Sequence, residues 1–155
     1  MKALFCHAQI QKCPFVAQFA RVLGMPNNTL HAKSVLSAIF QTIRERVPLF
    51  ASRTMVAYLP NDLKPLYLEE WNDEFSTRFD YSEFIHALMT LQGLEHIHVF
   101  HSKAEAELSV SGLFSVIKAH LSDNQYEDLM SFMPFSLRVN LMNDYGFEGH
   151  SYFYN

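Results

Sequence analysis

Three histidines that lie close together in the sequence are the first residues in this chain that could carry chemistry. His96, His98 and His101 form the only close group among eight histidines, and imidazole binds zinc and copper well. In an extended segment His96 and His98 would share a face, but no cysteine accompanies them and Glu95 would point to the other side. We therefore expect a polar loop between helices, with a metal site as the alternative. No cofactor is expected, and isolated histidines such as His31 are interpreted as surface or half-buried residues.

The sequence lacks the usual patterns for nucleophilic or phosphate chemistry. It has neither a G-x-S-x-G turn nor a glycine-rich phosphate loop. Cys6 and Cys13 follow a C-x6-C spacing, which is typical of neither a redox motif nor a zinc ribbon. Glu105 and Glu107 would point to different sides of a helix. No catalytic residue is expected, so a non-enzymatic protein is favoured and an enzyme is left open.

Aromatic side chains in two segments are the candidates for an interaction surface. Trp71, the only tryptophan, lies among acidic residues, where we expect a solvated connector and keep a recognition site as the alternative. Exposed aromatic clusters usually mark contacts, so the end of the chain either folds back on the core, which we favour, or docks on another subunit. Its aromatic residues are Tyr145, Phe147, Tyr152, Phe153 and Tyr154.

The elements that must position these residues are predicted to be helices. Apolar residues recur at the i, i+3, i+4, i+7 spacing of amphipathic helices, and only residues 97–100 have strand character. The fold class is therefore expected to be all-α. The expected helices span residues 2–23, 29–46, 51–59, 61–70, 82–92, 103–121, 124–132 and 135–143.

Several helix ends carry local signals. Capping residues are expected at the starts of four helices, where a short polar side chain accepts an amide hydrogen bond. They are Asn28 with its neighbour Asn27, Asp80, Ser102 and Ser122. Gly24 and Gly93 lie where helices should end, because glycine tolerates the left-handed conformation of a C-terminal cap.

Residues 36–68 and 110–142 read as two copies of one helical unit at a constant offset of 74. Apolar residues match along the register, as in Phe40 and Phe114, and both copies place a proline after an aromatic and an apolar residue. Upstream, Phe15 matches Phe84 at an offset of 69. We expect one domain over residues 1–155, about eight helices in two tandem pseudo-symmetric repeats. The repeats would span about 14–70 and 82–143, followed by a tail at 144–155.

Composition narrows the classes of partner. The formal charge is −4 and no basic run exists, so nucleic acid is not expected as a partner. No apolar window of 18 residues occurs, so no membrane partner is expected, and the start of the chain predicts a cytoplasmic protein. Charged residues make up 18% and aromatic residues 14%, which favours a face buried against a protein partner or in a homodimer. Arg44, Arg46 and Lys118 are expected on the solvent side of the long helices.

The stretch from Val35 to Trp71 resembles the bacterial family filed as domain of unknown function 2267. The resemblance is carried by Arg44-Glu45-Arg46-Val47-Pro48, Ala57-Tyr58-Leu59-Pro60, Leu63-Lys64-Pro65-Leu66-Tyr67 and Trp71, with an echo in Met133-Pro134 and Leu137-Arg138-Val139-Asn140-Leu141. It covers roughly residues 13–143 and implies a doubled helical pattern. Lys64-Pro65 departs from the leucine-arginine of that family, Met133 replaces a leucine, and the loop at 94–102 differs. The resemblance implies no activity.

Together these patterns favour a cytoplasmic, non-enzymatic interaction or scaffold module. The alternative is a small-ligand or metal-binding protein. Its site would lie at the seam between the repeats or in the loop of His96, His98 and His101.

Overall fold

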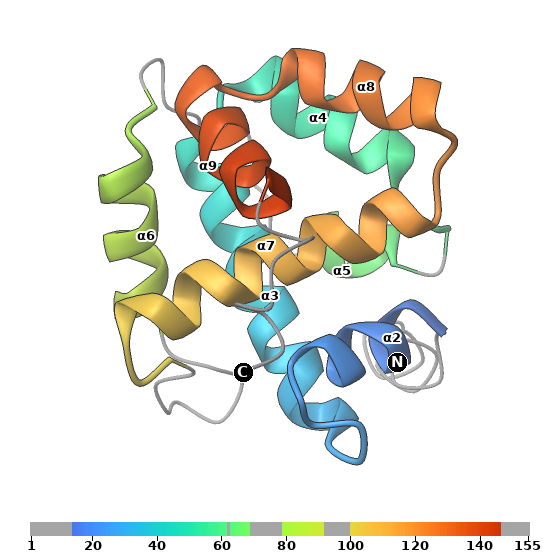
Figure 1. Ribbon diagram of the computed structural model, residues 1–155, viewed down its shortest axis with the longest axis vertical. Coiled ribbons are helices and arrows are strands. Elements are labelled where there is room, and N and C mark those ends of the chain that lie inside the picture. The colour runs from blue at the N-terminus through green and yellow to red at the C-terminus, as the bar shows by residue number, and fades with distance from the viewer. Residues whose placement is uncertain (1–13, 62, 69–78, 92–99, 147–155) are drawn as a thin grey trace.

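Eight α-helices and no strand make up the part of the chain that the computed structural model describes, residues 14–61, 63–68, 79–91 and 100–146 (Figure 1). The prediction of an all-α fold is therefore confirmed. The helices are α2 (Pro14–Val22), α3 (Thr29–Arg46), α4 (Leu49–Tyr58), α5 (Lys64–Leu68), α6 (Tyr81–Thr90), α7 (Lys103–Ala119), α8 (Asp123–Phe132) and α9 (Phe135–Gly146). Among the described residues, no helix combines the length and apolar character that a membrane span requires.

Four helices begin at the capping residues that the sequence predicts. Asn28 accepts a hydrogen bond from the amide of His31, and Asp80 accepts one from the amide of Glu83. Ser102 does the same for Glu105. Ser122 and Gln125 form a reciprocal capping box, which satisfies two amides at the start of α8. These bonds set where α3, α6, α7 and α8 begin.

The end of α2 is set by Gly24, which has a φ of +77°. The amide of Gly24 donates to the carbonyl of Arg21, and the amide of Met25 donates to that of Ala20. This is the Schellman arrangement, in which a residue in the left-handed conformation reverses the chain after a helix. The turn delivers the chain to α3 within a few residues. Gly93, the other expected cap, lies outside the described residues.

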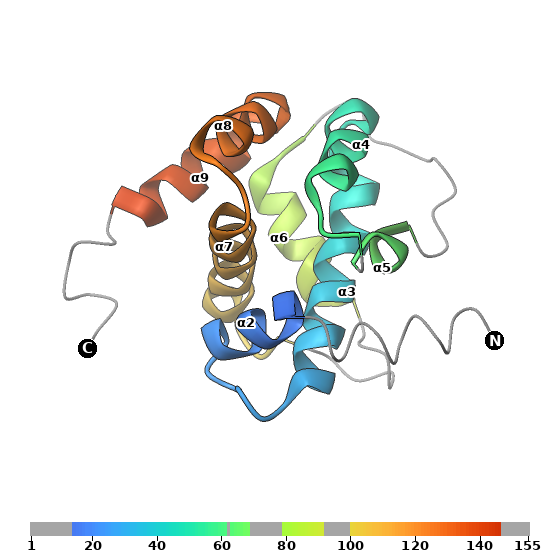
Figure 2. The same ribbon diagram turned by 90° about the vertical axis from the view of Figure 1, so that its right-hand side faces the viewer.

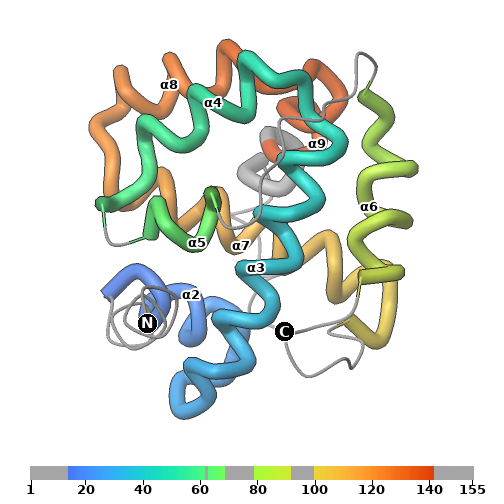
Figure 3. Tube along the Cα trace, turned by 180° about the vertical axis from the view of Figure 1, so that it is seen from behind, coloured from blue at the N-terminus to red at the C-terminus, as the bar shows by residue number. Residues whose placement is uncertain are grey.

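The two long helices, α3 and α7, lie at the centre and contact each other. Figure 2 shows them side by side, with α2 at one end and the pair α4 and α8 at the other. Helix α2 packs on both α3 and α7, and α6 also packs on both. Seen from behind in Figure 3, α4 and α8 run next to each other in opposite directions, while α5 lies against α3.

The core forms where the apolar stripes of these helices meet. Phe40 of α3 and Phe114 of α7 are fully buried, as are Phe15 and Phe84 on α2 and α6. The expectation for Arg44 was wrong, since it is only 9% exposed and donates from Nη1 to the carbonyl oxygen of Tyr67, at 2.8 Å. Arg44 was predicted to face solvent because it is charged, but a carbonyl of α5 accepts its hydrogen bond inside the protein. Arg46 and Lys118 are exposed, as predicted.

Candidate functional site

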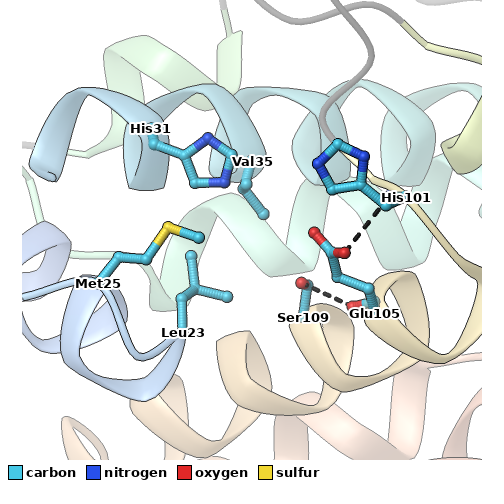
Figure 4. A pocket seen from close by; sticks show the side chains of 7 residues that line it. All are labelled: Leu23, Met25, His31, Val35, His101, Glu105 and Ser109. Atoms are coloured by element: carbon cyan, nitrogen blue, oxygen red, sulfur yellow. Dashed lines mark hydrogen bonds between the residues drawn. The ribbon is translucent and has the colours of Figure 1, made fainter.

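A pocket of about 180 Å³ opens where the turn after α2 meets the first halves of α3 and α7 (Figure 4). We call it the seam pocket. It is lined by Leu23, Met25, His31, Val35, His101, Glu105 and Ser109. Its volume is close to the roughly 150 Å³ of an engineered cavity that binds benzene, so it has room for a small molecule only.

Local structure explains how each side chain reaches the pocket. His31 and Val35 are four residues apart on α3, and Glu105 and Ser109 are four residues apart on α7, so each pair shares a helix face. Leu23 and Met25 flank Gly24, whose left-handed turn places them at the pocket. Helical periodicity and one glycine turn thus bring together residues that are about 80 positions apart in the chain.

The pocket has an apolar side and a polar side. Leu23, Met25 and Val35 form the apolar side. On the polar side, the carboxylate of Glu105 accepts a hydrogen bond through Oε2 from the amide of His101, at 3.3 Å. The hydroxyl of Ser109 donates to the backbone carbonyl of Glu105, at 2.8 Å. Figure 4 shows the Glu105 carboxylate and the two imidazoles around the same space. The arrangement offers a carboxylate and two imidazoles beside an apolar wall.

Within the described ranges, no three histidine, cysteine or carboxylate side chains are placed to hold a metal ion. Of the three histidines in the predicted metal loop, His96 and His98 lie outside the described residues. His101 lies beside Glu105 at the start of α7. The sequence reading missed His31 as a pocket residue. No local signal marks His31, because the pocket arises only where α3 packs beside α7 and the turn after α2.

A buried polar cluster joins α3, α4 and α5. The hydroxyl groups of Ser52 and Tyr67 are 2.6 Å apart, and both residues are fully buried. Arg44 lies against the same tyrosine. Burial raises the pKa of Tyr67 above its ordinary value of 10.0, although the Ser52 hydrogen bond and the Arg44 charge act in the opposite direction. The cluster is buried in the core, so its polar groups satisfy one another there.

A second candidate site, which we call the aromatic patch, consists of two exposed phenylalanines in contact and a third that follows them closely in the chain. Phe50 of α4 and Phe132 of α8 are 66% and 43% exposed, and their ring centroids are 5.1 Å apart in an edge-to-face contact. Phe135, at the start of α9, is 73% exposed. The guanidinium of Arg138 lies over its ring, with Cζ 5.8 Å from the centroid. The sequence reading did not select these phenylalanines, because the helical pattern alone does not show which aromatic residues remain uncovered.

The side chains of the aromatic residues that the sequence predicts as an interaction surface lie outside the described part of the chain. Tyr145 lies within α9, and its side chain is outside the described part of the chain. Also outside are Trp71, Phe147, Tyr152, Phe153 and Tyr154.

Comparison with known proteins gives one result that bears on identity. No curated protein matches the chain. A family model described as Uncharacterized conserved protein (DUF2267) matches residues 13–139. That range includes the helices from α2 to α8, both residue pairs of the seam pocket and the whole aromatic patch. The protein therefore belongs to this family of uncharacterised proteins.

Proposed function

We propose that the protein is a non-enzymatic interaction module of the cytoplasm that self-associates through the aromatic patch. The observation that carries this proposal is the contact between two exposed rings, Phe50 and Phe132, with the exposed Phe135 three residues further along the chain. Single exposed apolar residues are common on soluble proteins, but rings gathered on one surface usually mark a contact. Phenylalanine is enriched at the cores of interfaces for the same reason.

Charges around the patch favour a second copy of the chain as the occupant. Asp128 is exposed on α8 one helical turn before Phe132, so both lie on the same face. Arg138 lies beside Phe135, and its Nε is buried without a hydrogen-bond partner among the described residues. The surface thus carries both a carboxylate and a guanidinium around an aromatic centre. A two-fold interface requires such self-complementarity, since each copy presents the same surface.

The proposed architecture is a domain of two tandem repeats. Helices α4 and α8 begin and end 74 residues apart, and α3 and α7 begin 74 residues apart. A two-fold relation between the halves would exchange α2 with α6 and α3 with α7. Helix α2 packs on both α3 and α7, and α6 also packs on both, as this exchange requires. These observations support the repeat interpretation. The ring contact between Phe50 and Phe132 joins the matched helices α4 and α8.

Sedimentation equilibrium of the purified protein tests the proposal. We expect the wild-type protein to be a dimer and the double variant Phe50→Glu/Phe135→Glu to be a monomer. In the variant, a dimer would bury two carboxylates from each copy in the interface, and burying unpaired charges costs free energy. Leu108→Glu is the matched control, since Leu108 is 55% exposed on α7, outside the patch. That variant should remain a dimer.

A charge exchange makes the test specific. Arg138→Glu should weaken the dimer, and Asp128→Arg in the same chain should restore it if the two residues pair across the interface. A wild-type monomer at all concentrations, or a dimer that survives both glutamates in the patch, would refute the proposal. Expression with a fluorescent tag and cell fractionation test the cytoplasmic location.

Ligand binding at the seam pocket is a second candidate function, supported by the cavity of about 180 Å³ between α3 and α7. The alternative to an interaction module also includes metal binding, by the loop of His96, His98 and His101. Elemental analysis of the purified protein tests it directly. Stoichiometric zinc or copper that is lost in His98→Ala would support a metal site, and metal-free protein would argue against one.

A further inference from the structure

We propose that the seam pocket binds a small organic cation, a primary amine attached to an apolar body about the size of a benzene ring. This inference is independent of the aromatic patch, which involves other helices. It depends on three properties of the pocket: its charge, its division into two chemical sides and its size.

Charge selects a cation. Among the described lining residues, Glu105 is the only carboxylate and there is no lysine or arginine. Lys33 lies between His31 and Val35 on α3 and is buried, but its side chain is not among those that line the pocket. Lys103, two residues before Glu105, has its Nζ 3.8 Å from Oε1 of Glu107. Glu105 accepts a hydrogen bond from the backbone amide of His101 through Oε2, and none of the hydrogen bonds among the described residues involves Oε1. A carboxylate with an unused oxygen in a partly enclosed pocket is a good acceptor for an ammonium group.

The polar neighbours of Glu105 suit a primary amine in particular. An ammonium group has three N–H donors, and neutral imidazole nitrogens can accept hydrogen bonds. His31 and His101 lie on either side of the space in front of Glu105 (Figure 4). One donor would reach Glu105 Oε1, and an imidazole of the lining would accept from another. A quaternary ammonium would lack these donors.

The apolar side and the volume set the rest of the ligand. Leu23, Met25 and Val35 offer methyl and thioether groups, which pack well against a ring. By comparison with the engineered cavity of about 150 Å³ that holds the six carbons of benzene, a cavity of about 180 Å³ accommodates roughly seven non-hydrogen atoms, and more where the ligand extends to the mouth of the pocket. Benzylamine, with an ammonium group one methylene away from a phenyl ring, matches both requirements.

The test compares three probes of nearly equal size by calorimetry and NMR on the full chain. Benzylamine is a cation, benzyl alcohol is neutral and benzoate is an anion. We expect benzylamine to bind about tenfold more tightly than benzyl alcohol, as a hydrogen bond to a charged partner would provide, and benzoate not to bind. Methyl resonances of Met25 and Val35 should shift with benzylamine, which locates the ligand in the seam pocket.

Glu105→Gln tests the residue that carries the selectivity. Glutamine still offers an oxygen to the His101 amide, so the start of α7 should be retained, which circular dichroism checks. The variant should bind benzylamine and benzyl alcohol about equally. Glu107→Gln, which removes a carboxylate from the same helix outside the pocket, should keep the tenfold preference.

Four results would overturn the proposal. They are no binding of benzylamine to wild-type protein, tighter binding of benzoate, shifts at residues other than those of the pocket, and a preference for the amine that survives Glu105→Gln. Tight binding of Zn²⁺ that is lost in His31→Ala would assign the pocket to a metal instead. Loss of the aromatic-patch dimer would not affect any of these measurements, so the two proposals fail separately.

Discussion

Tyr67 shows how a single polar residue is accommodated in the core of this protein. Its side chain is fully buried, and its ring packs edge-on against Phe40, with centroids 5.0 Å apart. Its hydroxyl bonds to Ser52 and its carbonyl accepts from Arg44. Burying a hydroxyl without a partner costs free energy, so the Ser52 bond is what makes this position tolerable. The cluster ties α5 to α3 and α4.

The costs of removing the two hydroxyls of this pair should not be additive. Tyr67→Phe leaves the Ser52 hydroxyl buried without that partner, and we expect the free energy of unfolding to fall by about 1 to 3 kcal/mol. The double variant Ser52→Ala/Tyr67→Phe should cost less than the sum of the single variants, as urea unfolding can measure. Tyr58→Phe, at a half-buried tyrosine of α4, is the control and should change stability by less than about 0.5 kcal/mol. Additive effects of the two single changes would contradict the bond.

Stability should also decline at alkaline pH because of Tyr67. Burial raises its pKa in the folded state above the ordinary value of 10.0, so the folded protein holds a proton that the unfolded chain releases. The contribution is fully present below 10.0 and is lost as the pH rises above it. Urea unfolding through this range should show a falling free energy in wild-type protein. Tyr67→Phe should show a shallower decline, and equal slopes would contradict this assignment.

At the scale of elements, close packing between α2 and α7 depends on a glycine. A Cβ built at Gly112 of α7 would lie 2.6 Å from Cγ1 of Val22, the last residue of α2. Valine has few rotamers with which to move away. Because Gly112 has no side chain, α2 and α7 pack more closely than they could with a larger residue at this position. A second link at this contact is the 2.7 Å hydrogen bond between Gln18 and His120.

Gly112→Ala should therefore destabilise the protein even though alanine favours helices. The change gains up to about 1 kcal/mol of helix propensity, but the clash with Val22 should exceed that gain. In a Val22→Ala background the clash disappears, and Gly112→Ala should then stabilise by up to about 1 kcal/mol. Thermal unfolding of the four proteins measures both effects. The same sign in both backgrounds would show that Val22 does not limit this position.

For the whole molecule, the two proposed repeats should contribute similarly to stability. Leu59 and Met133 are matched in the register and are 4% and 3% exposed. We expect Leu59→Ala and Met133→Ala each to cost about 2 to 5 kcal/mol, because each leaves a cavity in the core. Leu108→Ala, at a residue that is 55% exposed, is the control and should be nearly silent. Near-neutral results at either buried position would contradict the equivalence of the two halves.

Both proposed sites lie where the matched positions differ. In the proposed register His31 corresponds to Glu105, and Val35 corresponds to Ser109. Phe132 in the aromatic patch corresponds to Tyr58 on α4, which is half-buried. In the proposed architecture, matched apolar residues would form the core, and the two proposed sites would lie at positions where the halves differ.

The sequence by itself determined the helices, most of their ends and most of the core. Apolar spacing, the caps at Asn28, Asp80, Ser102 and Ser122, and the turn at Gly24 depend on residues within a few positions of one another, so they can be read without knowledge of the fold. Only the tertiary structure decided which polar and aromatic side chains are covered. Arg44 is buried by α5, whereas Phe50, Phe132 and Phe135 remain exposed. The seam pocket was also beyond the sequence, because its walls come from α2, α3 and α7 and arise only when these helices pack.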